Sequence, residues 1–318
     1  MLNGDRAALA RVLTRVENDD DVGRAALDKL YPRSGEAHVI GLTGPPGAGK
    51  SSLANELIRQ YRSQGRKVAV IAIDPSSPLT GGAALGDRIR MLEWHADDGV
   101  FIRSMASRRF GGGLAEQTLA VASVFDAAGY DPVIIETVGA GQDEVAIAQL
   151  ALTTVLVQVP GMGDSIQTLK AGALEIGDVL VVAKADRPDS AELARDLRRM
   201  QTLTFNEGVD PSAWRPPVVT TSAVSGEGME ALISAIAEHR RWLDTSGAMR
   251  TRKRAIATTE LTGRIRGQIL RSLESVEGRS GHVAGVIDAI VERRITPQRA
   301  ASMILDKRAV PTIDQDPE

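Results

Sequence analysis

Apolar residues change their spacing along the chain, and the changes divide it into three parts. Near the amino end, Leu9, Leu13 and Val16 recur at helical spacing, and a second helical stretch ends near Pro32. From His38 onward, short apolar runs alternate with helical stretches, which is typical of a parallel sheet with helices packed against it. The predicted strands are His38–Thr43, Lys67–Ile73, Val100–Ile102, Val133–Glu136, Val155–Val159, Val179–Ala183 and Val218–Thr221.

The strand pattern stops after Trp242, and the remaining chain is predicted to be helical. A basic run, Arg250–Arg254, leads into a long helix with one apolar face, and Thr296-Pro297 marks the start of a last helix. The apolar stripe consists of Leu261, Ile265, Ile269, Leu273 and Val276. Such a stripe must be covered by the protein's own main domain or by a second copy of the arm. A solvated helix face is the commoner interpretation of the basic run, so we assign it no role.

These patterns predict an α/β fold with an N-terminal helical extension at residues 1–36, a mostly parallel sheet flanked by helices at 37–245, and a C-terminal helical arm at 246–318. Hydrophobic residues make up 43% of the 318 positions, which is enough for a large core. Only 3% of the residues are aromatic, so this core must consist of Val, Ile, Leu and Ala, as suits buried parallel strands.

Composition excludes several classes of partner and chemistry. The net charge of −3 gives no positive field for nucleic acid or anionic lipid. The absence of cysteine removes disulfides and thiolate chemistry, and four scattered histidines do not favour a transition-metal site. No stretch approaches the roughly 20 apolar residues of a membrane span. We expect a soluble cytoplasmic protein.

The clearest chemical signal lies where the first predicted strand ends and a helix begins. The residues are Gly44, Pro45, Pro46, Gly47, Ala48, Gly49, Lys50 and Ser51, which match G-x-x-x-x-G-K-[ST]. In such a P-loop, backbone N–H groups surround the phosphates, the lysine reaches the outer phosphates and the hydroxyl ligates Mg²⁺. The motif predicts a P-loop NTPase, with Ser52 as a further nucleotide contact.

Acidic residues follow later strands at the edge where the carboxyl ends of parallel strands meet. Asp74 and Glu136 each end an apolar run, and Asp87 lies in a loop rich in Gly, Ser and Pro. Each is a candidate Mg²⁺ ligand, directly or through water. A single carboxylate in such a place is more often a helix cap or a solvated turn, but their succession downstream of a P-loop favours metal binding.

Glu136-Thr-Val-Gly139 resembles a D-x-x-G switch with Glu in place of Asp. The Gly139 N–H can hold the γ-phosphate, and Gln142 can orient the attacking water. An exposed loop residue is the more common role for such a glutamine. The catalytic candidates are Lys50, Glu136 and Gln142.

The choice of base is indicated by two later strand ends. Lys184 and Asp186 stand where GTPases carry N-K-x-D, and Ser222, Ala223 and Val224 stand where they carry the S-A motif. An aspartate there accepts from two N–H groups that guanine has and adenine lacks, and Lys184 packs its stem over the base. Guanine is therefore favoured. Ala183 replaces the usual Asn, and the lost contact is worth about 1 to 3 kcal/mol if buried, so affinity or selectivity is expected to be relaxed.

The chain resembles the MeaB/ArgK-type GTPases, which carry a glutamate in the third motif. The matching stretches are Gly41–Ser51, Ile73–Pro78, Thr80–Met91, Ile102–Arg108, Gly112–Ala115 and Ile135–Gln142. The resemblance implies a homodimeric GTPase that binds GTP, GDP and Mg²⁺ and acts as a chaperone for an adenosylcobalamin-dependent acyl-CoA mutase, typically methylmalonyl-CoA mutase. The family would gate cofactor loading and protect the mutase from inactivation.

Carried over residue by residue, the resemblance implies Mg²⁺ binding by Ser51, Asp74, Asp87 and Glu136. It also implies a switch that couples nucleotide state to the partner, with Asp164, Gln167 and Lys170 as its residues. Asp164 is equally suited to cap a helix. Two departures, Ala183 and the stretch Asp164–Thr168, suggest the hypothesis of a divergent branch that serves a related mutase.

Three alternatives stay open. The first is an ATP-using transport-linked ATPase or kinase, the description attached to ArgK-like sequences, although no H-R-D or D-F-G kinase motif is present. The second is a nickel- or cobalt-handling metallochaperone, which the four separated histidines and missing cysteines disfavour. The third is a dimeric module that binds nucleotide without turnover, which hydrolysis with and without a partner would separate from a switch GTPase.

Overall fold

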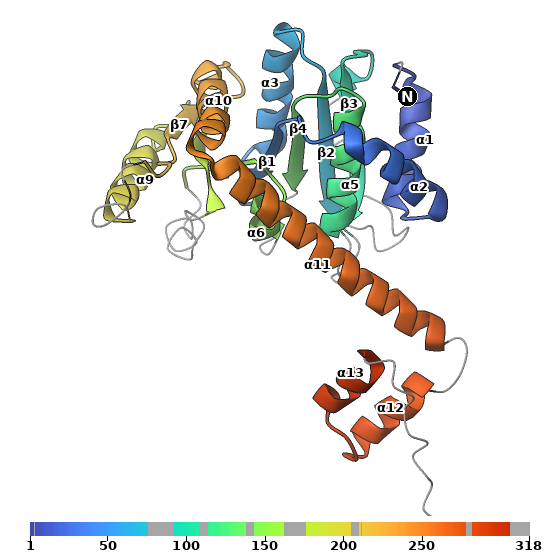
Figure 1. Cartoon of the computed structure of the whole chain (residues 1–318). Helices are drawn as coiled ribbons and strands as arrows, with labels where there is room; N and C mark the ends of the chain where they lie inside the picture. Colours follow the sequence, from blue (N-terminus) through green and yellow to red (C-terminus); the bar gives the residue numbers. More distant parts are fainter. Residues whose placement is uncertain are drawn as a thin grey trace, which may run out of the picture. The chain divides into compact units, whose positions relative to one another are not determined.

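A computed structural model of the chain shows a parallel sheet with helices on both faces, as the sequence predicted (Figure 1). It describes residues 1–2, 4–75, 92–107, 114–137, 143–161, 176–204, 210, 212–277 and 282–305. The seven-stranded sheet has the order β3-β2-β4-β1-β5-β6-β7, and every adjacent pair is parallel. The strands are β1 (Val39–Thr43), β2 (Val68–Pro75), β3 (Val100–Ser107), β4 (Val133–Thr137), β5 (Thr153–Gln158), β6 (Val179–Ala183) and β7 (Val218–Thr221).

Two apolar layers hold the helices against the sheet (Figure 1). One face of β1 packs against α3 (Lys50–Ser63) and α10 (Met229–Ser246), and the opposite face of the sheet packs against α5 (Leu114–Ala127) and α6 (Asp143–Ala148). At Gly41 of β1, an added Cβ would lie 2.4 Å from Ile147 Cγ2, so α6 packs too closely for any side chain there. The helix α9 (Ser190–Thr204) covers the β6–β7 end of the sheet.

The N-terminal extension covers the edge of the sheet at β3. Its helices α1 (Arg6–Glu17) and α2 (Asp21–Leu30) contact α5, and the 3₁₀ helix η1 (Tyr31–Arg33) follows them. The side chain of Asp20 caps α2 by accepting from Gly23 N at 2.7 Å, which explains the acidic break between the two helices. Arg103 of β3 pairs with Glu17, and this contact explains why β3 continues beyond the apolar run that predicted its end at Ile102.

The chain forms two compact units, Met1–Gly263 and Arg264–Glu318, and the division falls inside the long helix α11 (Ala248–Glu277). The second unit also contains α12 (His282–Val291) and α13 (Pro297–Leu305). As predicted, α13 begins at a proline, and Arg299 N donates to Thr296 Oγ1 at 3.2 Å. The three-part division with boundaries at 36 and 245 stays a prediction. Among the described helices, none has the length and apolarity that crossing a membrane requires.

Two buried histidines lie at the amino edge of the sheet, opposite the strand ends that carry the predicted site. His38 Nε2 lies 2.7 Å from Thr153 Oγ1, which lies 2.8 Å from His239 Nδ1. Burial lowers the pKa of each histidine to about 3; the positive charge of Arg240 adds to this at His38, and that of Arg252 adds at His239. Both side chains are therefore neutral at neutral pH.

These histidines predict a loss of stability in mild acid. Between pH 6.5 and 5 the unfolded histidines take up protons while the folded ones do not, so the free energy of unfolding should fall by up to ~1.4 kcal/mol per pH unit for each histidine. Asp178, whose pKa is raised by burial, contributes with the opposite sign, because its folded form binds a proton more readily than its unfolded form. Urea titrations at several pH values measure the free energy of unfolding. This free energy should depend less steeply on pH in His38→Gln and His239→Gln than in the wild type. The exposed His95→Gln variant is the control. A wild-type free energy of unfolding that does not change between pH 6.5 and 5 would refute the prediction.

Candidate nucleotide-binding site

The predicted P-loop connects the end of β1 to the start of α3, as the motif requires. Its three glycines have left-handed backbone conformations, with φ of 138° at Gly44, 74° at Gly47 and 91° at Gly49. A Cβ on Gly44 would lie 2.1 Å from the carbonyl oxygen of Val157, so the close approach to β5 adds a second reason for glycine. The loop therefore has the backbone shape that exposes N–H groups to an anion at a helix N-terminus.

Lys50 lies inside this loop and is only 5% exposed. Its ammonium donates to the carbonyl oxygens of Gly44 at 2.7 Å and Pro45 at 3.0 Å. The loop thus holds a buried positive charge at the place where the motif predicts the outer phosphates.

Ser51 and Glu136 meet next to the loop. The Ser51 hydroxyl donates to Glu136 Oε1 at 2.5 Å, and the two residues are 7% and 1% exposed. Glu136 lies opposite Leu42 of β1 and Ala72 of β2, which places it between the P-loop strand and β2. A hydroxyl and a carboxylate are the hard oxygen donors that Mg²⁺ prefers, so this pair fits the predicted metal site.

Of the other predicted metal ligands, the structure gives only the backbone of Asp74, two residues beyond Ala72 in β2. The remaining predicted residues Asp87, Gly139, Gln142, Asp164, Gln167 and Lys170 lie outside the described residues. In the described part of the chain, no group of three or more His, Asp or Glu side chains forms a cation site. The roles of these residues stay predictions.

The predicted base-binding residues come together beside the P-loop. Ser222 Oγ donates to Asp186 Oδ1 at 3.1 Å, and Ala185 N donates to the carbonyl of Thr221 at 2.9 Å, so the loops after β6 and β7 are joined. Lys184 has a left-handed backbone, with φ of 59°, and its ammonium donates to the carbonyl of Gly47 at 3.0 Å. The sequence predicted that Lys184 would lie over the base; it did not predict this bond to the P-loop.

A groove of about 380 Å³ runs beside these residues along α3. Its lining residues are Ser51, Ser52, Asn55, Glu56, Arg59, Ala223 and Val224. The groove therefore brings four predicted nucleotide-binding residues to one surface: Ser51 and Ser52 from the start of α3, and Ala223 and Val224 from the loop after β7.

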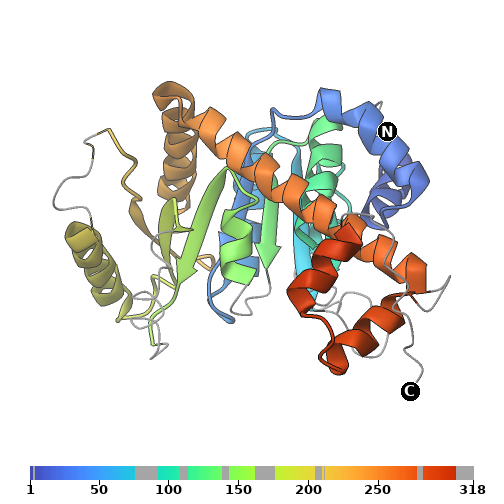
Figure 2. The same cartoon turned by 60° about the horizontal axis from the view of Figure 1, so that its bottom comes forward.

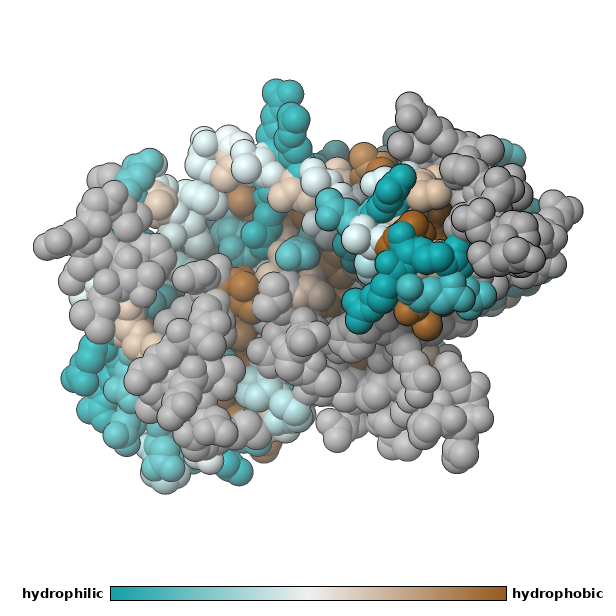
Figure 3. Space-filling view, turned by 90° about the horizontal axis from the view of Figure 1, so that it is seen from below, coloured by the Kyte–Doolittle hydropathy of each residue, from teal (hydrophilic) through white to brown (hydrophobic). Residues whose placement is uncertain are grey.

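Figure 3 shows the molecule from below, where the described residues have mixed hydropathy and no single large apolar patch.

Three lining residues of the groove were not predicted from the sequence: Asn55, Glu56 and Arg59. Asn55 and Arg59 follow Ser51 at intervals of four residues, so they share its side of α3. Asn55 accepts from Trp94 Nε1, and Arg59 contacts Glu93 Oε1 at 3.1 Å, so both hold the 3₁₀ helix η2 (Leu92–Trp94). The spacing from Ser51 was the available signal, but the partners 34 to 39 positions away could not be read from it.

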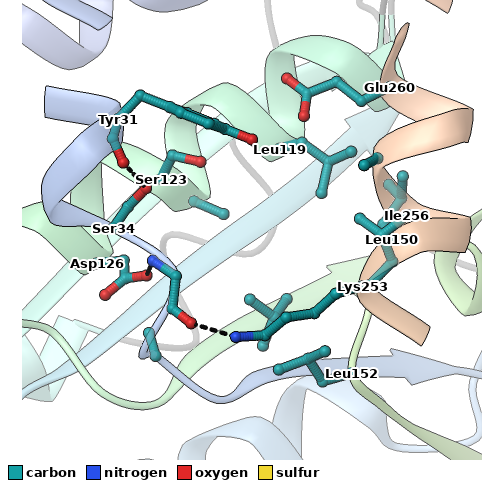
Figure 4. A pocket seen from close by; sticks show the side chains of 15 residues that line it. Tyr31, Ser34, Leu119, Ser123, Asp126, Leu150, Leu152, Lys253, Ile256 and Glu260 are labelled. Carbon is teal, nitrogen blue, oxygen red and sulfur yellow. Dashed lines mark hydrogen bonds between the residues drawn. The ribbon is translucent and has the colours of Figure 1, made fainter. Parts of the chain in front are cut away.

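A second cavity, of about 220 Å³, contains none of the predicted site residues (Figure 4). It lies between η1, α5 and the first turns of α11. Its floor is apolar, with Val39, Leu119 and Leu152 among its lining residues. Two polar side chains at the rim already have partners, because Ser34 bonds the Tyr31 carbonyl and Lys253 bonds the Gly35 carbonyl. We assign no ligand to this cavity.

A glycine loop between a parallel strand and a helix, a lysine inside it and a hydroxyl–carboxylate pair beside it define a P-loop nucleoside triphosphatase. The family model described as "Methylmalonyl Co-A mutase-associated GTPase MeaB" matches residues 9–277. The chain therefore belongs to the MeaB/ArgK family of P-loop GTPases, and it is a GTPase.

Relatives and a solved structure agree with this assignment. A Pyrococcus abyssi protein whose name describes a GTPase is 45% identical over 305 residues, covering 96% of this chain and 94% of its own. The GTPase ArgK of Escherichia coli is 32% identical, covering 93% and 90%. The mouse protein named methylmalonic aciduria type A homolog is 28% identical, covering 96% and 77%. The crystal structure titled "LAO/AO transport system kinase" aligns with a TM-score of 0.70 at 26% identity, covering 96% and 94%.

Proposed function

We propose that this GTPase binds GTP with Mg²⁺, forms a homodimer and acts as a chaperone for an adenosylcobalamin-dependent acyl-CoA mutase. Methylmalonyl-CoA mutase or a close relative would be the partner, and the chaperone would gate cofactor loading and protect the mutase. The observation that carries the mutase assignment is the match of residues 9–277 to a family model whose description names that association. The mouse homologue's name supports the same assignment.

For the nucleotide, we propose that the P-loop amides, Ser52 and the Lys50 ammonium hold the phosphates. Ser51, Asp74, Asp87 and Glu136 would hold Mg²⁺, which neutralises developing charge on the phosphates when bound. The observation in support is the 2.5 Å contact between Ser51 and Glu136 beside the loop. Gly139 would hold the γ-phosphate, and Gln142 would orient the attacking water.

The base would lie between the two joined loops. Asp186 would accept from the guanine N1–H and exocyclic NH₂, while Lys184 and the Ser222–Val224 segment would line the other sides. Ser222 supports this arrangement, because its hydroxyl holds one carboxylate oxygen of the exposed Asp186 at 3.1 Å and so orients the group. Ala183 offers the base no hydrogen bond, so we expect weaker binding than a complete N-K-x-D motif would give.

An ATP-using, transport-linked kinase is a second candidate because the solved relative with the TM-score of 0.70 carries that title. The Asp186 carboxylate argues against it, since adenine presents no pair of donors to a carboxylate at this position. A comparison of GTP and ATP hydrolysis by the same preparation separates the two candidates.

The mutase role predicts a nucleotide-dependent complex. The purified GTPase should bind methylmalonyl-CoA mutase, or a mutase acting on a related acyl-CoA, and its GTP hydrolysis should rise by an order of magnitude or more in the complex. If Asp164, Gln167 and Lys170 form the partner-coupling switch, Lys170→Ala should lose this stimulation, and the exposed Arg250→Ala should keep it. Failure of every tested mutase to bind in both the GDP and the GTP-analogue states would refute the chaperone role.

A further inference from the structure

The basic run at the start of α11 is not simply a solvated helix face. Arg250 and Arg254 are exposed, as that interpretation predicts, but Arg252 and Lys253 bond to two different segments of the main body of the same compact unit. The nucleotide site does not explain this run.

Arg252 holds three groups at the amino edge of the sheet. Its Nε donates to the carbonyl of Ala151 at 3.0 Å, and one terminal nitrogen lies 2.9 Å from Asp178 Oδ2 and 3.4 Å from Thr154 Oγ1. The Arg252 and Asp178 side chains are 26% and 17% exposed, so water only partly screens this ion pair.

Asp178 is itself held in place by several hydrogen bonds. Its backbone N–H donates to the Thr154 carbonyl at 2.8 Å, and its carbonyl accepts from Trp214 Nε1 at 2.7 Å. Its carboxylate also accepts from Thr154 N at 2.7 Å, and His239 Nε2 lies 3.4 Å away. Burial raises the pKa of this carboxyl and Arg252 opposes the rise, which is the pattern of a buried charge that requires its partner. The Arg252–Asp178 ion pair thus attaches α11 to β5 and β6, because Asp178 is itself held firmly by its hydrogen bonds.

Lys253 makes the second attachment. Its ammonium donates to the carbonyl of Gly35 at 2.7 Å (Figure 4). The amides of Gly35 and Glu36 are held in turn by Asp126 at the end of α5. Lys253 therefore ties α11 to the segment that leads into β1, on the side of the helix next to the 220 Å³ cavity.

Packing continues the attachment along the same side of α11 (Figure 2). Ile256 packs against the core layer of α5 and α6, and a Cβ on Gly263 would lie 1.4 Å from Glu116 Oε1 in the first turn of α5. At 100° per residue, Arg252, Lys253, Ile256 and Gly263 all fall within about 100° of the helix circumference. Leu261, on the opposite side, is 61% exposed. One side of α11 is thus fixed to the GTPase domain as far as Gly263, and an apolar residue faces outward.

We propose that Arg252 and Lys253 are positioning residues that clamp the first half of α11, from Ala248 to Gly263, to the sheet. The outward apolar residue Leu261 would then be presented to a second copy of the chain on a helix that is held in place. The part concerning the second copy rests on the proposed homodimer; the clamp itself does not.

The clamp is tested by hydrogen exchange on the full-length protein. Arg252→Met alone leaves the Asp178 carboxylate buried without its cation, so the double variant Asp178→Asn/Arg252→Met removes both charges together. Lys253→Met removes the other attachment and leaves no buried charge. Amides of residues 250–262 should exchange about tenfold faster or more in both variants, with unchanged exchange in β2 and β4, which neither side chain contacts. Arg254→Met, an exposed cation in the same helix, is the matched control.

Analytical sedimentation of the same proteins measures self-association, which should not change if Arg252 and Lys253 only stabilise α11 locally. Self-association should weaken about tenfold or more in the clamp variants and stay at the wild-type value in Arg254→Met, while GTP affinity stays the same in all. Unchanged exchange in residues 250–262 would overturn the clamp, and faster exchange with undiminished self-association would overturn the positioning role. A monomeric wild type would refute the homodimer, and the exchange result would still decide the clamp.

Discussion

Lys50→Met should reduce GTP affinity by roughly two orders of magnitude or more and bring GTP hydrolysis to the background rate. Two charge-assisted hydrogen bonds to phosphate, at about 1.5 to 3 kcal/mol each, account for an effect of this size. The Lys50 ammonium is buried inside the loop and donates hydrogen bonds of 2.7 and 3.0 Å to two loop carbonyls. It is therefore already placed where phosphate oxygens would accept from it.

Methionine suits this test because it keeps the length and apolar packing of the lysine stem. The variant should therefore fold and melt much like the wild type, and its loss of binding should not reflect unfolding. Lys67→Met, an exposed change just before β2, is the control. Calorimetric titration with GTP and steady-state hydrolysis are the measurements. Wild-type affinity in Lys50→Met would show that this lysine does not contact the phosphates.

Asp186→Asn should convert a guanine site into one that prefers xanthine. Guanine offers two N–H donors to the Asp186 carboxylate, whereas the asparagine NH₂ would face one of them and repel it. Xanthine carries a carbonyl where guanine has its amino group, so it pairs with the amide instead. A site whose hydrogen bonds are mismatched loses about 10²-fold or more in affinity, so GTP binding should fall by that order and xanthosine triphosphate binding should rise.

The substitution is nearly isosteric, and Ser222 Oγ, now 3.1 Å from Asp186 Oδ1, can still donate to the asparagine carbonyl. The joined loops after β6 and β7 should therefore keep their structure. Competition of GTP, xanthosine triphosphate and ATP for one fluorescent nucleotide measures the change. If Asp186→Asn kept a preference for GTP, the base would lie elsewhere, and the alternative of an ATP-using enzyme would gain support.

The parts of the site that could be predicted from sequence are those with local causes. The positive φ of Gly44, Gly47 and Gly49 follows from the motif, and the start of α3 at Lys50 follows from the same residues. Each apolar run became a strand because buried parallel strands need continuous apolar sequence. The strand ends were less predictable, since β3 extends to Ser107 through Arg103, whose partner Glu17 lies 86 positions away.

Contacts between distant segments could not be predicted from patterns of spacing. The bond from Lys184 to Gly47 spans 137 positions, and that from Arg252 to Asp178 spans 74. A basic run in a helix has the same pattern whether it faces water or a buried carboxylate, so the sequence alone favours the commoner interpretation, a solvated helix face. Only the packing of α11 against the sheet distinguishes the two.

The central claim is that this GTPase holds a guanine nucleotide together with Mg²⁺ through Lys50, Ser51 and Glu136. Calorimetric titration of the wild-type protein with GTP, in the presence of Mg²⁺ and again with the metal chelated, tests it most directly. We expect saturable GTP binding that weakens markedly when Mg²⁺ is removed, with ATP binding weaker under both conditions. GTP binding that does not depend on Mg²⁺, or no GTP binding by the folded protein, would contradict it.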